Sequence, residues 1–321
     1  MQTFRNLLSG KVLAVLAAAA LIQSCNSTPE QKAKVVALDT IQNAEISEKL
    51  ETSISNFPSP VDVVTQISLS KVSYKAEWLN SPDHATNYYN TPTKQSLNLG
   101  VYMTDLGYTC SYFQVQDAVN RLSSTKKLSE ELSVLNSYEN SLVTRFESNL
   151  KNRDSLINIV REVYYSADEY LRKNKRTDVA AIMLTGAWTE GLFLATQVNK
   201  AFPRRPVDET QAKAHKAIMA QIGFQKRSLP HLISALQKIN SDPEIKAVIE
   251  KLMALEGAFA KVVIKDPVSN DSLPDITKLD DLGDITDLTV LGISDNVEIT
   301  EETVNEITKQ VEELRELIIS Q

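Results

Sequence analysis

Glycine, cysteine, histidine and tryptophan are all scarce in this chain of 321 residues, which contains 9, 2, 3 and 2 of them respectively. Few glycines, and almost no alternation of apolar and polar residues before residue 285, argue against a β-sheet protein and indicate a helical one. The histidines are not spaced as metal ligands, and the zinc motif HExxH is absent. A phosphate-binding loop and the motifs GxGxxG and GxSxG are absent as well. We therefore expect no bound metal, no cofactor and no enzymatic activity.

Acidic residues outnumber basic ones by 41 to 34, so the net charge is −7. Residues 1–24 contain two basic and no acidic side chains, which leaves 34 − 2 = 32 basic and 41 acidic groups in the rest of the chain, a net charge of −9. Nucleic acid and anionic headgroups both favour a basic surface, so we expect no nucleic-acid partner. Eight aspartates lie within residues 266–299, but their spacing does not match a calcium-binding loop, which favours a solvated acidic loop.

Two basic residues near the N-terminus precede an apolar run of eleven residues, Val12 to Ile22. This run is too short to span a membrane, which takes about 20 residues, but has the length of a secretory signal. It leads into Leu21-Ile22-Gln23-Ser24-Cys25, which resembles the lipobox of bacterial lipoproteins, with an aliphatic residue at minus three and a small residue at minus one. The resemblance covers only the first 25 residues. It implies that residues 1–24 are a signal peptide and that Cys25 carries a diacylglycerol and an acylated amino terminus.

The alternative is an ordinary cleaved signal with a chance cysteine near the cut. If Cys25 is acylated, two or more fatty chains would hold the protein stably on a membrane, whereas a single chain gives only marginal membrane binding. Residues 25–45 are polar and are expected to be the lipidated N-terminus and a tether. Asn26 and Ser27 follow the cysteine in place of an aspartate. By resemblance, this pattern implies the outer membrane, and we expect the protein to face the periplasm.

Helix starts are marked by proline behind a side chain that can cap a free amide, as at Ser81-Pro82, Thr91-Pro92 and Asp242-Pro243. Pro230 is expected to bend or split a long helix. Residues 266–299 contain a short β-branched run and predict an irregular excursion or small hairpin. With the apolar periodicity, the sequence predicts helices over 60–79, 92–123, 126–134, 137–150, 154–174, 177–200, 208–239, 243–263 and 300–319.

Two of these helices, 92–123 and 177–200, have apolar or small residues on nearly every side and are expected to be enclosed. Their glycines indicate close approach of neighbouring backbones, since glycine otherwise costs about 1 kcal/mol in a helix. The two segments resemble each other: Gly100-Val101-Tyr102 and Leu106 match Gly186-Ala187-Trp188 and Leu192 at a constant offset of 186 − 100 = 86. An ancient duplication would explain this echo. Cys110 is expected to be a small buried residue on the first helix.

Asp105 and Glu190 fall on apolar stripes of these two helices, so both carboxylates are expected to face the interior. A buried carboxylate is costly unless paired, and in a cleft its raised pKa makes it a candidate acid or base. The functional hypothesis is a ligand pocket between the two helices, lined by Tyr102, Asp105, Tyr108, Trp188 and Glu190. The alternative is that each acid accepts bonds from tyrosine, threonine or a basic side chain such as Arg161 and only orients the core.

Residues 80–91 form a polar segment that carries Tyr88 and Tyr89. These rings could stack on a sugar or peptide, or could tuck against their own domain.

The sequence therefore predicts an all-α protein in which residues 46–321 form a single helical domain, built as a compact bundle or a stack of antiparallel helix pairs. The pattern is similar to that of uncharacterised all-helical envelope lipoproteins of Gram-negative bacteria, a likeness that carries over no active residues. The expected function is a lipid-anchored, non-catalytic envelope protein that binds or scaffolds a protein partner. The alternative is a periplasmic solute- or glycan-binding protein that uses the pocket between helices 92–123 and 177–200.

Overall fold

The computed structural model describes residues 59–134, 139–203, 205–239, 242–265 and 296–320. The chain divides into two units, residues 1–43 and 44–321, and all described residues lie in the second. The predicted signal peptide, Cys25 and the tether therefore lie outside the described residues and stay predictions.

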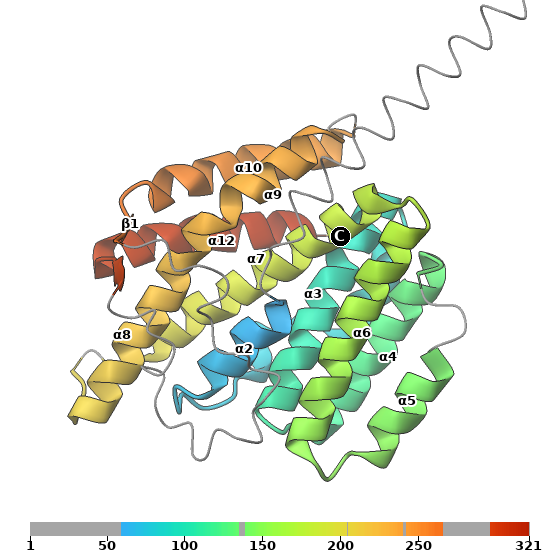
Figure 1. Cartoon of the computed structure of the whole chain (residues 1–321), viewed down its shortest axis with the longest axis horizontal. Coiled ribbons are helices and arrows are strands. Elements are labelled where there is room, and N and C mark those ends of the chain that lie inside the picture. The colour runs from blue at the N-terminus through green and yellow to red at the C-terminus, as the bar shows by residue number, and fades with distance from the viewer. Residues whose placement is uncertain (1–58, 135–138, 204, 240–241, 266–295, 321) are drawn as a thin grey trace, which may run out of the picture. The chain divides into compact units, whose positions relative to one another are not determined.

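The all-α class is confirmed, because the described regular structure is helical apart from one pair of two-residue strands (Figure 1). The α-helices are α2 (Pro60–Ser68), α3 (Pro92–Ser111), α4 (Val115–Glu131), α5 (Glu139–Ser148), α6 (Arg153–Lys173), α7 (Thr177–Ala201), α8 (Glu209–Phe224), α9 (Leu229–Gln237), α10 (Pro243–Phe259) and α12 (Glu301–Ile319). Three 3₁₀ helices join them, η1 (Ala76–Trp78), η2 (Pro82–Tyr88) and η3 (Gln225–Arg227).

The predicted helix starts are confirmed by their caps. Thr91 Oγ1 accepts a hydrogen bond from Lys94 N at 3.1 Å, and Asp242 Oδ1 accepts one from Glu244 N at 2.8 Å. Each cap satisfies an amide that the first turn of a helix leaves free. The long predicted helix 208–239 is split as expected, since η3 separates α8 from α9 and Pro230 lies in the first turn of α9.

Two predicted helices end well before the sequence indicates, and the break predicted between residues 123 and 126 is absent, since α4 runs through it from Val115 to Glu131. The helix expected over 92–123 ends at Ser111, where Phe113 adopts a φ of 56° and its N–H bonds to Cys110 O at 2.9 Å. A left-handed residue of this kind closes a helix, and it is usually glycine. The helix expected over 60–79 ends at Ser68, and Lys71 has a φ of 62°. Neither break has a glycine or proline to mark it, which is why the pattern missed both.

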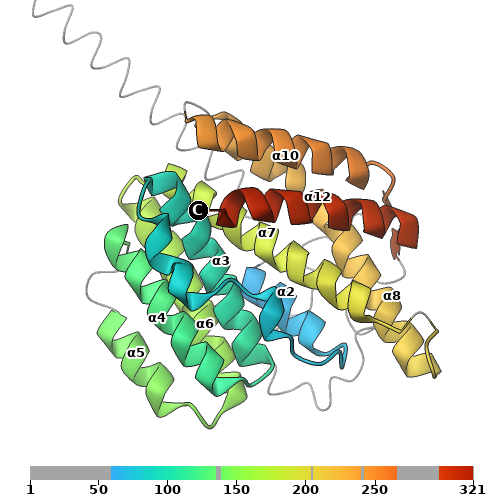
Figure 2. The ribbon, with the colours of Figure 1, turned by 180° about the vertical axis from the view of Figure 1, so that it is seen from behind.

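The α3 and α7 helices form the centre of this unit. Both start near the C-terminal end of α12 and run in the same general direction, so the central pair is not antiparallel (Figure 1). Figures 1 and 2 show α4, α5 and α6 on the α3 side of this pair, and α8, α9, α10 and α12 on the α7 side. By length and composition α7 could cross a membrane, but its apolar window is fully buried among the other helices, as in a core helix. The prediction that both helices are enclosed is confirmed for α3 and α7, but not for residues 112–123 of the first predicted helix, where Phe113 is 42% and Val119 is 36% exposed.

The backbones of α3 and α7 touch at two glycines. A Cβ on Gly100 would lie 2.0 Å from Met183 O, and a Cβ on Gly186 would lie 1.9 Å from Leu97 O. Real Cβ atoms never come so close to a backbone oxygen, so only glycine fits either position. These are the glycines of the sequence echo, and each lies against the backbone of the other helix at the crossing.

A two-stranded antiparallel pair closes the excursion that was predicted near 266–299. Strand β1 (Val263–Ile264) pairs with β2 (Val297–Glu298), with Val263 opposite Glu298. The interior of the excursion, including the β-branched run 288–291 and all eight aspartates, lies outside the described residues. After it, α12 begins behind the predicted cap, since Thr300 Oγ1 accepts a bond from Thr303 N at 3.2 Å.

Gly100→Ala and Gly186→Ala are each expected to lower the free energy of unfolding by about 3 kcal/mol, the upper end of the usual cost of overpacking. The control is Gly257→Ala on α10, where a Cβ would meet nothing within 4 Å. That substitution is expected to raise stability by up to about 1 kcal/mol through helix propensity. Urea unfolding of the three variants measures the difference. Equal effects at all three positions would contradict the close contact.

Candidate functional site

The five predicted site residues are all buried, with exposed fractions between 0% and 5%. Tyr102, Asp105 and Tyr108 come from α3, and Trp188 and Glu190 come from α7. Both carboxylates face the interior, as the sequence predicted. Neither of the basic residues that lie beside them, Arg121 of α4 and Arg315 of α12, was foreseen.

Glu190 forms a bidentate ion pair with Arg315. The Arg315 Nε and Nη2 atoms donate to the two Glu190 carboxylate oxygens at 2.6 and 2.9 Å. The guanidinium also donates to Trp78 O at 3.0 Å and lies over the Phe193 ring, 4.1 Å from its centroid. Glu190 is fully buried, so this pair replaces the water that the carboxylate would otherwise keep. The pair fixes α12 to α7 across 315 − 190 = 125 positions of sequence.

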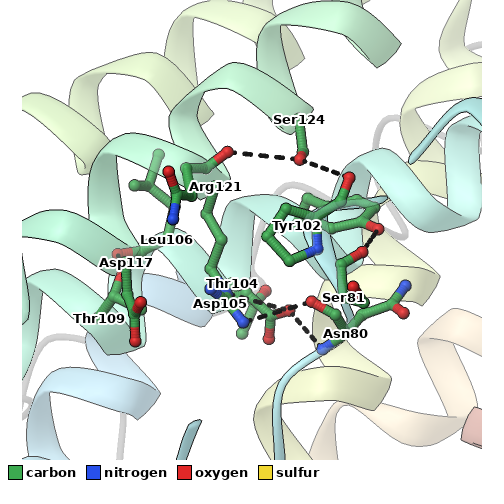
Figure 3. A network of polar contacts seen from close by, with 12 residues as sticks. Asn80, Ser81, Tyr102, Thr104, Asp105, Leu106, Thr109, Asp117, Arg121 and Ser124 are labelled. Carbon is green, nitrogen blue, oxygen red and sulfur yellow. Dashed lines mark hydrogen bonds and ion pairs between the residues drawn. The ribbon is translucent and has the colours of Figure 1, made fainter. Parts of the chain in front are cut away.

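Asp105 is held less completely. Its Oδ2 accepts a hydrogen bond from Asn80 N at 3.0 Å and lies 3.9 Å from Arg121 Nε (Figure 3). Its Oδ1 and the Arg121 Nε have no hydrogen-bond partner among the described residues. Arg121 instead donates through Nη2 to Asn80 O at 3.3 Å.

Burial raises the pKa of the Asp105 carboxyl well above its usual range, and the neighbouring Glu190 carboxylate raises it further. Arg121, Arg315 and the Asn80 amide oppose this shift but do not cancel it. The physical reason is that one hydrogen bond and a guanidinium at 3.9 Å replace too little of the water that a charged carboxylate requires.

Two of the three aromatic residues, Trp188 and Tyr108, do not converge on the carboxylates. Trp188 Nε1 donates to Ser228 Oγ at 2.9 Å, just before α9. Tyr102 OH donates to Ser81 O, whereas Tyr108 packs 4.6 Å from the Tyr112 ring, centroid to centroid. The structure therefore gathers Tyr102, Asp105 and Glu190 in one buried region and points Trp188 and Tyr108 elsewhere. The ligand pocket itself stays a prediction.

Other candidates from the sequence also turn inward. Tyr88 is 1% exposed and donates to Ile319 O at 2.9 Å, so it tucks against its own domain. Arg161, named as a possible partner for the carboxylates, pairs instead with Asp62 at 2.9 Å. Cys110 is buried on α3 as predicted, and burial raises the pKa of its thiol to about 12. Among the described residues, no group of three or more His, Cys, Asp or Glu side chains is placed to hold a metal ion.

The end of α12 is tied to α3 by polar side chains that the sequence did not single out. Lys94 Nζ donates to Leu317 O at 2.8 Å and to Ser320 O at 3.0 Å, and Asn98 Nδ2 donates to Ile318 O at 3.0 Å. The last carbonyls of a helix have no intrahelical partner, and a cation beside them is favourable. A lysine and an amide in the first turns of a helix give no sequence signal for this contact.

Arg315→Ala is expected to lower the free energy of unfolding by about 3–5 kcal/mol, because it leaves Glu190 buried without a partner. The control is Lys173→Ala, whose pair with Glu169 is exposed by 73% and 64% and is expected to contribute less than about 1 kcal/mol. The double variant Glu190→Leu with Arg315→Met is expected to lose less than Arg315→Ala, since it removes both charges. Chemical denaturation measures all three, and a double variant as unstable as Arg315→Ala would contradict the charge argument.

Asp105→Asn is expected to change how stability depends on pH. A carboxyl whose pKa is higher in the folded than in the unfolded protein contributes fully to the stability of the fold at pH values below its unfolded pKa. This contribution is lost as pH rises through the folded pKa. Asparagine cannot ionise, so the variant should match the parent in acid and become increasingly more stable than it as pH rises. Unfolding midpoints of both proteins, measured from about pH 4 to about pH 9, test this. Parallel curves over the whole range would show that the Asp105 pKa is not raised.

Comparison of the chain with protein-family models, with curated proteins and with solved structures gave no match. No residue role is therefore transferred from a relative.

Proposed function

We propose that this protein is a lipid-anchored component of the bacterial cell envelope that binds or scaffolds another protein and catalyses no reaction. The observation that carries the proposal is the bidentate bond between fully buried Glu190 and Arg315, at 2.6 and 2.9 Å. A general acid or base has to reach the reacting group within hydrogen-bond distance. A carboxylate that holds two helices together through both oxygens does not do so, which favours a structural role.

The anchor follows from the lipobox-like sequence that ends in Cys25. Two or three acyl chains on this residue would hold the protein on a membrane without a spanning helix. The predicted tether after Cys25, residues 26–45, has 45 − 25 = 20 residues. Fully extended, such a chain would reach about 70 Å, so the helical unit could meet a partner away from its own membrane. The absence of an aspartate after Cys25 favours the outer membrane, and the absence of a strongly acidic cluster just after it favours the periplasmic side.

A second candidate, a solute- or glycan-binding protein, draws support from Asp105 Oδ1 and Arg121 Nε. Both atoms are buried and have no hydrogen-bond partner in the part of the chain that is described. A small polar ligand could use them. In that case Asp105→Asn would weaken ligand retention, whereas a purely structural Asp105 would affect stability and leave ligand retention unchanged.

The anchor is tested with Cys25→Ser and the control Cys110→Ser, each produced in a Gram-negative host. We expect the parent and Cys110→Ser in the membrane fraction, with a mature N-terminus at Cys25 that carries a diacylglycerol. Cys25→Ser is expected in the soluble fraction. Mass spectrometry of the N-terminal peptide decides, and a mature start elsewhere or an unmodified sulfur overturns the anchor. Crosslinking in the native envelope then tests for a protein partner, and an empty result would favour the small-ligand alternative.

A further inference from the structure

The segment Trp78–Pro82, here called the strap, runs between η1 and η2 and is bound through its backbone by side chains from three helices. Arg315 of α12 donates to Trp78 O at 3.0 Å. Asp105 of α3 accepts from Asn80 N at 3.0 Å, and Arg121 of α4 donates to Asn80 O at 3.3 Å (Figure 3). Tyr102 and Ser124 donate to the next two carbonyls, Ser81 O and Pro82 O.

These hydrogen bonds are made to the main chain of the strap and not to its side chains. Asn80 is the exception, since its Nδ2 donates to Tyr88 OH at 3.0 Å. The strap is held as an extended peptide is held by a binding groove, where bonds to the backbone give affinity. Its buried apolar anchor is Leu79, which is 8% exposed, while Trp78 is partly buried against the same core.

The strap does not use all of the groove. Asp105 Oδ1 and Arg121 Nε are buried beside Asn80 and have no hydrogen-bond partner among the described residues. Buried polar groups left without partners are costly. A peptide that offered a donor to Asp105 and an acceptor to Arg121 would fill the groove better than the strap.

The chain that leads into the strap is mostly exposed and is held chiefly at Tyr74, whose OH donates to Asp117 Oδ2 at 2.6 Å and whose ring packs against Tyr108 and Tyr112. From Lys71 to Glu77 most residues are exposed, and Lys71 has a left-handed φ of 62°. The Lys75 amide is bound only by Tyr108 OH, at 3.4 Å. Few buried contacts and exposed backbone are the properties of segments that open locally while the rest of a protein stays folded.

We propose that Asp105, Arg121, Arg315 and Tyr102 form a peptide-binding groove that the strap occupies in cis, and that an extended segment of a protein partner binds there when the strap leaves. The inference rests on the proposed protein-binding function and names the kind of partner. It is independent of the lipid anchor, so a bare Cys25 would overturn the anchor and leave the groove untouched.

The test uses Leu79→Asp, which removes the apolar anchor of the strap and changes no groove residue. The control is Ala76→Asp, an exposed position of η1. The probe is a fluorescent peptide with the sequence of residues 75–83, measured by anisotropy. We expect it to bind Leu79→Asp at least tenfold more tightly than the parent or Ala76→Asp, because their own strap competes. The same peptide methylated on the Asn80 nitrogen is expected to bind at least tenfold more weakly, since it cannot donate to Asp105.

A folded Leu79→Asp variant that binds neither peptide, or both equally, overturns the proposal. Hydrogen exchange on the unaltered chain covers the case in which this variant does not fold. The groove requires that the Asn80 amide exchange through a local opening, with weaker protection than the amides of Val101 and Ala187 at the helix crossing. An Asn80 amide that exchanges only when the whole unit unfolds makes the strap a fixed part of the core and also overturns the proposal.

Discussion

The arrangement of the helices depends on the direct backbone contact between α3 and α7 at Gly100 and Gly186. Because neither position can hold a Cβ, the two axes come closer than side chains between them would allow. Small residues nearby continue the contact, and Thr104 Oγ1 donates to Ala187 O at 3.2 Å. Beyond the crossing the helices diverge, and α2 packs there, with Val61 and Val64 against Gly107 and Val63 against Gly191.

Close approach at the crossing brings two acidic side chains, Asp105 and Glu190, into the interior. A basic side chain from another helix lies beside each of them. Arg315 and Arg121 supply the opposing charges. The two pairings differ in strength. Glu190 accepts two short hydrogen bonds from Arg315, whereas the Arg121 guanidinium beside Asp105 donates instead to the Asn80 carbonyl. The Glu190–Arg315 pair therefore holds α12 against α7, while Asp105 and Arg121 keep unused hydrogen-bonding atoms beside the strap. Hydrogen bonding is complete at Glu190 and incomplete at Asp105, although the sequence alone presents the two carboxylates as equivalent.

Much of the fold could be predicted from the sequence because it follows from short stretches of neighbouring residues. Proline behind a capping side chain gave the starts of η2, α3 and α10, and Pro230 gave the break before α9. The nearly charge-free, apolar composition of residues 177–200 predicted the burial of α7. The breaks after Ser68 and Ser111 were missed because Lys71 and Phe113 adopt a left-handed backbone that neither residue favours. Packing of the surrounding helices, which no local pattern encodes, overrides that preference.

By itself, the sequence determined the helical class, the burial of Asp105 and Glu190 and the need for close contact at the glycines, since periodicity and residue size act within one helix. The tertiary structure alone decided which groups meet. Arg121 and Arg315 are ordinary surface-like residues in sequence, and they become partners of the acids only because α4 and α12 pack on opposite sides of the central pair. Pairing across 125 positions of chain is a property of packing, and spacing within a helix carries no information about it.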